Sequence, residues 1–317
     1  MKKYINEVID ALQNIPDFEG VDPSNISRLG GLTNLVHKVE MDTQSVIVRI
    51  PGPGTEEYID RVVEANNAKV AAKVGVSPKV IYSDTNSGIM VTETVKNIET
   101  MSPDLFKMRK EAPKRAGQAL AKLHNSGETF EFRFELFSMI DEYLEILSTK
   151  DVNFPNGYHE VVKAARPIKD LLEKANLPLA PCHCDPLCEN FLDDGNIMWI
   201  VDWEYSGMND PLWDLGDLSV EAGMSDIQDL ELLQAYFGRH PTDQETARMI
   251  IYKAMCDLLW TLWGLIQHAD KNPAEDFWAY ATTRFARCKE LMQHRSFQDH
   301  LKFVRLLMMS CFLHFHS

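Results

Sequence analysis

The stretch that decides how this chain folds runs His183-Cys184-Asp185-Pro186-Leu187-Cys188-Glu189-Asn190. It has the form H-x-D-x-x-x-x-N, and Asp202 follows at the end of an apolar, strand-like run over residues 197–201. Residues 193–196 read Asp-Asp-Gly-Asn, a turn sequence that predicts a β-hairpin. Asn190 and Asp202 are therefore expected on adjacent strands, near the same end of that hairpin.

These polar side chains are the ones that phosphoryl transfer requires. A carboxylate must accept or orient the substrate hydroxyl, and an amide with a second carboxylate must hold the Mg²⁺ ions that neutralise the phosphates. Asp185 suits the first role, and Asn190 with Asp202 suits the second. One alternative is that these side chains merely cap loops. Another is a zinc site, built from Cys182, His183, Cys184 and Cys188. Zinc is disfavoured because neighbouring residues on an extended strand point to opposite faces.

Short strands and one helix are expected upstream. The strands are predicted over residues 25–29, 35–40, 45–50, 80–83 and 89–94, and the helix over residues 60–74. A glycine-rich loop joins the first two strands. Its candidate phosphate-binding residues are Gly30, Gly31, Thr33 and Asn34. Glycines there allow backbone N–H groups to approach phosphate oxygens. The sequence of this loop lacks the form G-x-x-x-x-G-K-[S/T], which disfavours a P-loop fold.

A single cation interrupts the third predicted strand. Arg49 lies in the apolar run Ser-Val-Ile-Val-Arg-Ile, where a charge needs a partner. Such a cation can hold the α- and β-phosphates while a carboxylate on the following helix fixes its side chain. Glu64 is the predicted partner, with Glu56 and Glu57 as alternatives.

The pattern becomes helical after about residue 100. Helices are predicted over residues 110–123, 246–267 and 276–294. Together with the upstream strands, this layout predicts an α+β, two-lobed fold. It has a small sheet lobe, a hinge near residues 94–97, and a larger, mainly helical lobe.

Composition and charge exclude several classes of protein. The 317-residue chain carries a net charge of −15, which disfavours nucleic acid and anionic membranes as partners. We expect no signal peptide and no membrane insertion, and therefore a cytoplasmic protein. The six cysteines are then expected to be free thiols.

Taken together, these features resemble the choline/ethanolamine kinase and aminoglycoside phosphotransferase superfamily, whose fold is protein-kinase-like. The resemblance runs from about residue 26 to about residue 287 and is strongest to bacterial choline kinases. It implies Asp185 as the catalytic residue, Asn190 and Asp202 as metal ligands, and Arg49 in place of the phosphate-binding lysine of protein kinases. It also implies a hinge that binds adenine at Glu93 and Val95. The antiparallel-sheet N-lobe would then span residues 1–96, and the helical C-lobe residues 97–317.

The resemblance also suggests the substrate. Choline kinases carry a W-x-x-W pair and a downstream tyrosine, which fall here on Trp260, Trp263 and Tyr280. A quaternary ammonium donates no hydrogen bond and is best held by aromatic faces. Glu204 and Tyr205, which follow the metal-binding aspartate, complete the expected substrate site. ATP, Mg²⁺ and choline are thus the expected ligands; ethanolamine, an aminoglycoside or another small molecule on the same fold is the alternative. By the same resemblance, Asp214 braces the catalytic loop.

Overall fold

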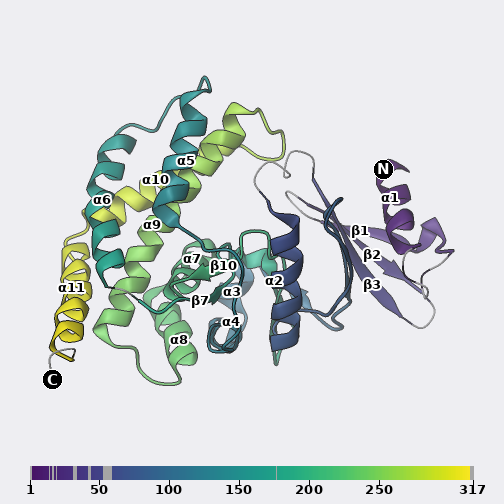
Figure 1. The fold of residues 1–317 in the computed structure, drawn as a ribbon, viewed down its shortest axis with the longest axis horizontal. Coiled ribbons are helices and arrows are strands. Elements are labelled where there is room, and N and C mark those ends of the chain that lie inside the picture. Colours follow the sequence, from purple (N-terminus) through teal and green to yellow (C-terminus); the bar gives the residue numbers. More distant parts are fainter. Residues whose placement is uncertain are drawn as a thin grey trace.

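A five-stranded antiparallel sheet forms the N-terminal part of the computed structural model (Figure 1). The structure describes residues 2–13, 15, 18, 20–30, 34–41, 44–52, 59–175 and 177–314. The strand order is β1-β2-β3-β5-β4. The strands are β1 (Ile26–Gly30), β2 (Asn34–Glu40), β3 (Ser45–Pro51), β4 (Val80–Asp84) and β5 (Ile89–Glu93).

The two faces of this sheet have different surroundings because side chains alternate along each strand. Val46, Val48 and Ile50 of β3 are buried in a small core with Val8 and Leu12 of α1 (Lys2–Leu12). The side chains between them, including that of Arg49, therefore face the opposite way, toward the rest of the molecule.

The helix α2 (Arg61–Val74) lies between the sheet and the C-terminal helices (Figure 1). It begins at Asp60, whose carboxylate accepts hydrogen bonds from Val62 N (2.9 Å) and Val63 N (3.1 Å). It ends at Gly75, which has a left-handed backbone with φ 78°. Because Glu64 lies in the first turn and is buried, the capped start of α2 fixes the position of a carboxylate inside the protein.

The remaining two thirds of the chain are mainly helical. The helices are α3 (Pro103–Met108), α4 (Ala112–His124), α5 (Leu136–Ser148), α6 (Tyr158–Lys174), α7 (Leu212–Ala222), α8 (Asp226–Phe237), α9 (Asp243–Ala269), α10 (Phe277–Gln293) and α11 (Phe297–His314). The helix α9 is central, and α5, α7, α10 and α11 pack against it. By length and composition α9 could cross a membrane, but 78% of its most apolar window is buried inside the protein, as in the core helix of a globular domain.

Short strands connect these helices. β7 (Ala180–Cys182) pairs with β10 (Gly207–Asn209), and β6 (Glu99–Thr100), β8 (Phe191–Asp193) and β9 (Met198–Ile200) form a three-stranded sheet. Two 3₁₀ turns, Pro23–Asn25 and Cys188–Asn190, precede β1 and β8. All of these strand pairs are antiparallel.

The predicted fold class is confirmed: an antiparallel sheet is followed by a mainly helical region. The five predicted strands and the helix over 60–74 are found with small shifts at their ends. Sequence reasoning missed α1, whose apolar side chains have a partner only once the sheet is assembled. The five cysteines whose side chains are described are free, as expected, and all five are buried.

Candidate active site

One cavity of about 850 Å³ brings the predicted site residues together. It is lined by side chains of the sheet, of α2, of the β8–β9 hairpin and of the C-terminal helices. The predicted residues that line it are Asn34, Arg49, Glu64, Glu93, Val95, Asp185, Asn190, Asp202, Glu204, Tyr205, Trp260, Trp263 and Tyr280. Gly30 ends β1, whereas Gly31 and Thr33 lie outside the described residues.

The hairpin places Asn190 and Asp202 at the same end, as predicted. Phe191 pairs with Ile200 across β8 and β9, and Val201 N donates a hydrogen bond to the backbone oxygen of Asn190 (2.9 Å). Gly195 in the connecting turn has φ 92°, a conformation that glycine adopts without steric cost. The hairpin therefore explains why two residues twelve positions apart line one cavity.

Asp214 holds the backbone that precedes Asp185. Its carboxylate accepts hydrogen bonds from His183 N (2.7 Å) and Cys184 N (2.8 Å), and lies 3.0 Å from Nε2 of His124. Cys184 has φ 68°, a left-handed conformation that costs a residue with a side chain free energy. Asp214 offsets that cost, in agreement with its expected bracing role.

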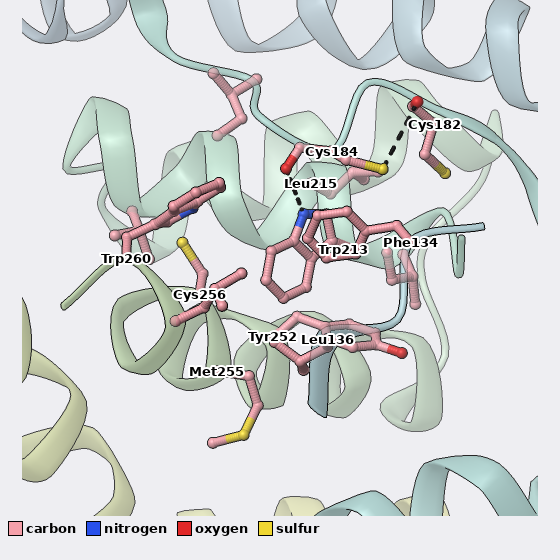
Figure 2. Close-up of a cluster of buried hydrophobic side chains, with 14 of the residues drawn as sticks. Phe134, Leu136, Cys182, Cys184, Trp213, Leu215, Tyr252, Met255, Cys256 and Trp260 are labelled. Atoms are coloured by element: carbon pink, nitrogen blue, oxygen red, sulfur yellow. Dashed lines mark hydrogen bonds between the residues drawn. The ribbon is translucent and has the colours of Figure 1, made fainter. Parts of the chain in front are cut away.

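Trp213 supports the same loop from below (Figure 2). Its Nε1 donates to the backbone oxygen of Cys184 at 3.0 Å, and its ring is fully buried. On the other side of Asp185, Asn190 Nδ2 donates to the Asp185 backbone oxygen at 3.1 Å. The backbone of Asp185 is thus fixed from both sides, which orients its side chain at the cavity wall.

The Asp185 carboxyl has an unusual electrostatic environment. Burial raises its pKa well above the ordinary value, because a buried carboxyl loses the hydration of its charged form. The negative charges of Asp217, Glu221 and Asp202 raise this pKa further, in that order, while Arg284 opposes them. A carboxylate that is readily protonated is suited to accept a proton from a substrate hydroxyl.

Five charged side chains near the sheet form what we call the ionic cluster: Arg49, Arg61, Glu64, Asp202 and Glu204. Arg49 donates to Glu64 and to Asp202 Oδ1 (2.6 Å), and lies 3.6 Å from Glu204. The predicted pairing of Arg49 with Glu64 is therefore present; Glu56 and Glu57 lie outside the described residues. Burial disfavours the charged form of Arg49, but Glu64, Asp202 and Glu204 outweigh it and raise its pKa.

Sequence reasoning missed the contribution of Arg61. Its Nη1 donates to Glu64 Oε2 (2.8 Å) and to Glu204 Oε1 (2.6 Å), which joins the first turn of α2 to the segment after Asp202. Burial and the charge of Asp202 raise the pKa of Glu204, whereas the two arginines lower it. Glu204 is expected at the substrate, and its described partners are Arg49 and Arg61 of the ionic cluster.

The same carboxylates fit a divalent cation. Oxygen atoms of Glu64, Asp202 and Glu204 lie within 4.8 Å of one another, and Asn190 lines the same cavity. Carboxylate and amide oxygens are the ligands that Mg²⁺ prefers. None of the groups of metal-ligating atoms that gather in the described part of the chain is the zinc set of Cys182, His183, Cys184 and Cys188.

Four aromatic side chains of the cavity form what we call the aromatic cluster: Tyr205, Trp260, Trp263 and Tyr280. The Tyr205 and Trp260 rings meet edge to face with centroids 5.5 Å apart, and those of Trp263 and Tyr280 at 5.7 Å. Trp260 and Trp263 are nearly one turn apart on α9, and Tyr280 comes from α10. The prediction that these rings gather in one place is confirmed.

Charged residues around the aromatic cluster were also missed. Arg284 lies with its guanidinium 4.5 Å from the centre of the Tyr280 ring, and it donates to Glu221 and to Asp257 Oδ1 (3.2 Å). Both Arg284 and Glu221 line the cavity. A signal was present in the sequence: Asp214, Asp217 and Glu221 follow each other at helical spacing within an otherwise apolar helix, α7.

The comparisons with known proteins agree with the geometry of this site. A family model described as choline/ethanolamine kinase matches residues 26–231. A solved choline/ethanolamine kinase family protein from Mesorhizobium loti is 55% identical, with a TM-score of 0.88 over 95% of this chain and 99% of its own.

Two further relatives differ in the substrate that their names give. The structure of choline kinase LicA from Streptococcus pneumoniae is 27% identical, with a TM-score of 0.74 over 92% of this chain and 98% of its own. Ethanolamine kinase 1 of Mus musculus is 27% identical and covers 80% of each chain. The relative named for choline and the relative named for ethanolamine are thus equally similar in sequence to this chain.

Proposed function

This chain belongs to the choline/ethanolamine kinase family, and we propose that it transfers the γ-phosphoryl group of ATP to the hydroxyl of choline. The observation that carries the proposal is a single cavity in which Asp185 shares a wall with both the ionic cluster and the aromatic cluster. Charges of both regions act on the Asp185 carboxyl, since Asp202 and Glu221 each raise its pKa. A group in that position can meet a hydroxyl and a phosphate together.

The aromatic cluster supports choline over ethanolamine. A trimethylammonium group presents only C–H groups and a spread positive charge, which aromatic faces stabilise by about 0.5–2 kcal/mol each. A primary ammonium would instead need several hydrogen-bond acceptors to replace its water. Tyr205, Trp260, Trp263 and Tyr280 offer four rings in one region of the cavity, and Glu221 and Glu275 add negative charge to its wall.

ATP is the phosphoryl donor, and we propose that it binds on the side of the ionic cluster. Adenine would lie against the backbone of residues 93–95, all of which line the cavity. The phosphates would meet Arg49 and backbone N–H groups of residues 30–34, which include Gly30, Gly31, Thr33 and Asn34. This arrangement divides the chain into a nucleotide-binding lobe, residues 1–96, and a substrate-binding lobe, residues 97–317.

Asn190 and Asp202 would hold Mg²⁺, with Glu64 and Glu204 close to Asp202. The bound ion would neutralise phosphate charge. Asp185 would accept a hydrogen bond from the choline hydroxyl and direct its oxygen at the γ-phosphorus. As the new P–O bond forms, the bond from the γ-phosphorus to the bridging oxygen breaks, ADP leaves with that oxygen, and Asp185 takes the hydroxyl proton. Because the transition state of such transfers is loose, the positioning of the two substrates contributes more than proton abstraction.

The test is a substrate panel. ADP release by the purified protein is measured with ATP and Mg²⁺ and with choline, ethanolamine or an aminoglycoside at matched concentrations. We expect the highest kcat/KM with choline, and loss of turnover when EDTA removes the metal. A higher kcat/KM for ethanolamine would assign the chain to that substrate, and turnover of the aminoglycoside alone would refute both amino alcohols.

A further inference from the structure

A fully buried carboxylate lies behind the aromatic cluster, outside the cavity itself. Asp217 of α7 accepts a hydrogen bond from Trp260 Nε1 at 3.3 Å and another from Cys256 Sγ at 2.7 Å. Its exposed fraction is 0%, and that of Trp260 is 4%. Figure 2 shows the thiol of Cys256 next to the Trp260 ring. Asp217 therefore does not line the cavity, and its hydrogen bond to the indole connects it to the aromatic cluster.

The described part of the chain gives Asp217 no cation at ion-pair distance. The neighbouring cation is Arg284, whose nitrogens donate to Glu221 and to Asp257 instead. Arg287 likewise pairs with Asp257, at 2.6 Å. A buried carboxylate without a paired cation is costly, because two neutral donors do not replace the solvation that the charge has lost. A positive charge that binds nearby lowers this free-energy cost.

We propose that Asp217 is a positioning residue for the cationic substrate. Asp217 fixes the Trp260 ring through the indole N–H, and its negative charge strengthens the attraction of that ring for the substrate ammonium. The inference rests on the proposed function, since it takes the cation to be that of a small amino alcohol. It adds a specificity determinant that does not touch the substrate.

Two physical effects would act in the same direction. The hydrogen bond to Nε1 removes the freedom of the indole to rotate, so the ring is already oriented when the substrate arrives. The carboxylate also lies at the edge of the ring in a region of low dielectric constant, where a charge acts over a longer distance than in water. A cation on the cavity face of Trp260 is therefore attracted both by the ring and by the charge at the edge of that ring.

The charge of Asp217 depends on its neighbours. Burial and the adjacent Glu221 raise its pKa, whereas the hydrogen bond from Cys256, Arg284 and the hydrogen bond from Trp260 lower it. The other ionisable groups that act in this region are Asp257 of α9, next to Cys256, and Asp185 of the catalytic loop. The carboxylate form of Asp217 gains population as pH rises, so the assay is repeated over a series of pH values that extends to the alkaline side. The quaternary ammonium of choline does not titrate.

The test separates charge from shape. Asp217→Asn keeps an oxygen that can accept from Trp260 Nε1 but removes the charge. The KM of this variant is measured for choline, for its uncharged isostere 3,3-dimethylbutan-1-ol, and for ATP. We expect the KM for choline to rise about tenfold, and the KM values for the isostere and for ATP to stay within about twofold of wild type. Any change in kcat should be the same for both alcohols, because the charge of Asp217 also raises the pKa of Asp185 and so acts on both reactions alike.

Two control variants and one substitute complete the design. Asp226→Asn removes an exposed carboxylate at the start of α8 and should leave all three KM values unchanged, which controls for net charge. Cys256→Ala removes the other hydrogen bond to Asp217 but keeps the carboxyl group. Because the lost hydrogen bond raises the pKa of Asp217, this variant should raise the KM for choline, by less than Asp217→Asn does, and leave the KM for the isostere unchanged. If Asp217→Asn has a lowered melting temperature, Asp217→Ser is a smaller uncharged replacement for the same measurements.

Several results would overturn the inference. An unchanged KM for choline in Asp217→Asn would mean that the carboxyl is neutral and contributes no charge. An equal rise for choline and for its isostere would mean that Asp217 acts only on packing. The proposed function is tested separately by turnover of choline in the wild-type protein, which does not depend on the variants.

Discussion

The ionic cluster and the aromatic cluster line one cavity but are built in opposite ways. The ionic cluster joins side chains from β3, from the start of α2 and from the segment after β9, so it holds together regions more than a hundred residues apart. The aromatic cluster is drawn mostly from α9 and α10, which pack side by side. Changes in the ionic cluster should therefore affect ATP and the fold together, whereas changes in the aromatic cluster should affect choline alone.

Asp185 lines the cavity together with both clusters, so its loss should have the largest effect. We expect Asp185→Asn to lower kcat by about 10³-fold, because the amide cannot accept the hydroxyl proton. The KM values for ATP and choline should change much less. Steady-state kinetics with circular dichroism check this.

The matched control is Asp194→Asn in the β8–β9 turn. This carboxylate accepts from Asn196 N and Ile197 N and does not line the cavity. The control should keep its kcat. Near-normal turnover by Asp185→Asn would refute the proposed mechanism.

The next largest effect is expected in the ionic cluster. Arg49→Ala removes two charge-assisted contacts and leaves Glu64, whose side chain is 2% exposed, without one of its arginines. We expect the KM for ATP to rise by about 10- to 100-fold and the melting temperature to fall. The KM for choline should change far less.

Lys38→Ala on the neighbouring strand is the control for this experiment. Its partner Glu40 is exposed, and a surface pair of this kind contributes little. The ionic cluster would lose its assignment to ATP if Arg49→Ala raised the KM for choline as much as that for ATP.

A change in the aromatic cluster should raise the KM for choline and leave the KM for ATP unchanged. Trp263→Ala removes a ring that meets both Tyr280 and Phe277, and we expect the KM for choline to rise about tenfold with an unchanged KM for ATP. Trp278→Ala is the control, because this ring packs against His268 and does not line the cavity. Equal effects on both substrates, or equal effects of the two variants, would contradict a cation site.

The smallest effect is expected where α9 meets α10. A Cβ added at Gly264 would lie 2.6 Å from Cδ1 of Tyr280, so Gly264→Ala must displace that ring. Overpacking of this kind costs about 1–3 kcal/mol, and we expect a melting temperature a few degrees lower and a KM for choline raised about threefold. A stability loss with no change in that KM would show that the position of Tyr280 does not matter for choline.

The sequence by itself determined the local parts of this protein. The spacing of Asp185, Asn190 and Asp202 could be interpreted because a short hairpin fixes which residues meet, and Trp260 and Trp263 because a helix does. Arg49 was recognisable as a charge in an apolar strand, and its partner was one of three nearby glutamates. Each of these inferences depends on contacts within one element or between neighbouring elements.

Only the tertiary structure decided the rest. Arg61 and Arg284 have ordinary sequence surroundings, and their roles depend on which side chains distant elements bring to them. Asp217 is one acidic residue among 47 in the sequence until α7 and α9 pack and place Trp260 and Cys256 on its carboxylate. Burial and partners set the chemistry of an acidic side chain, and both are products of the assembled core.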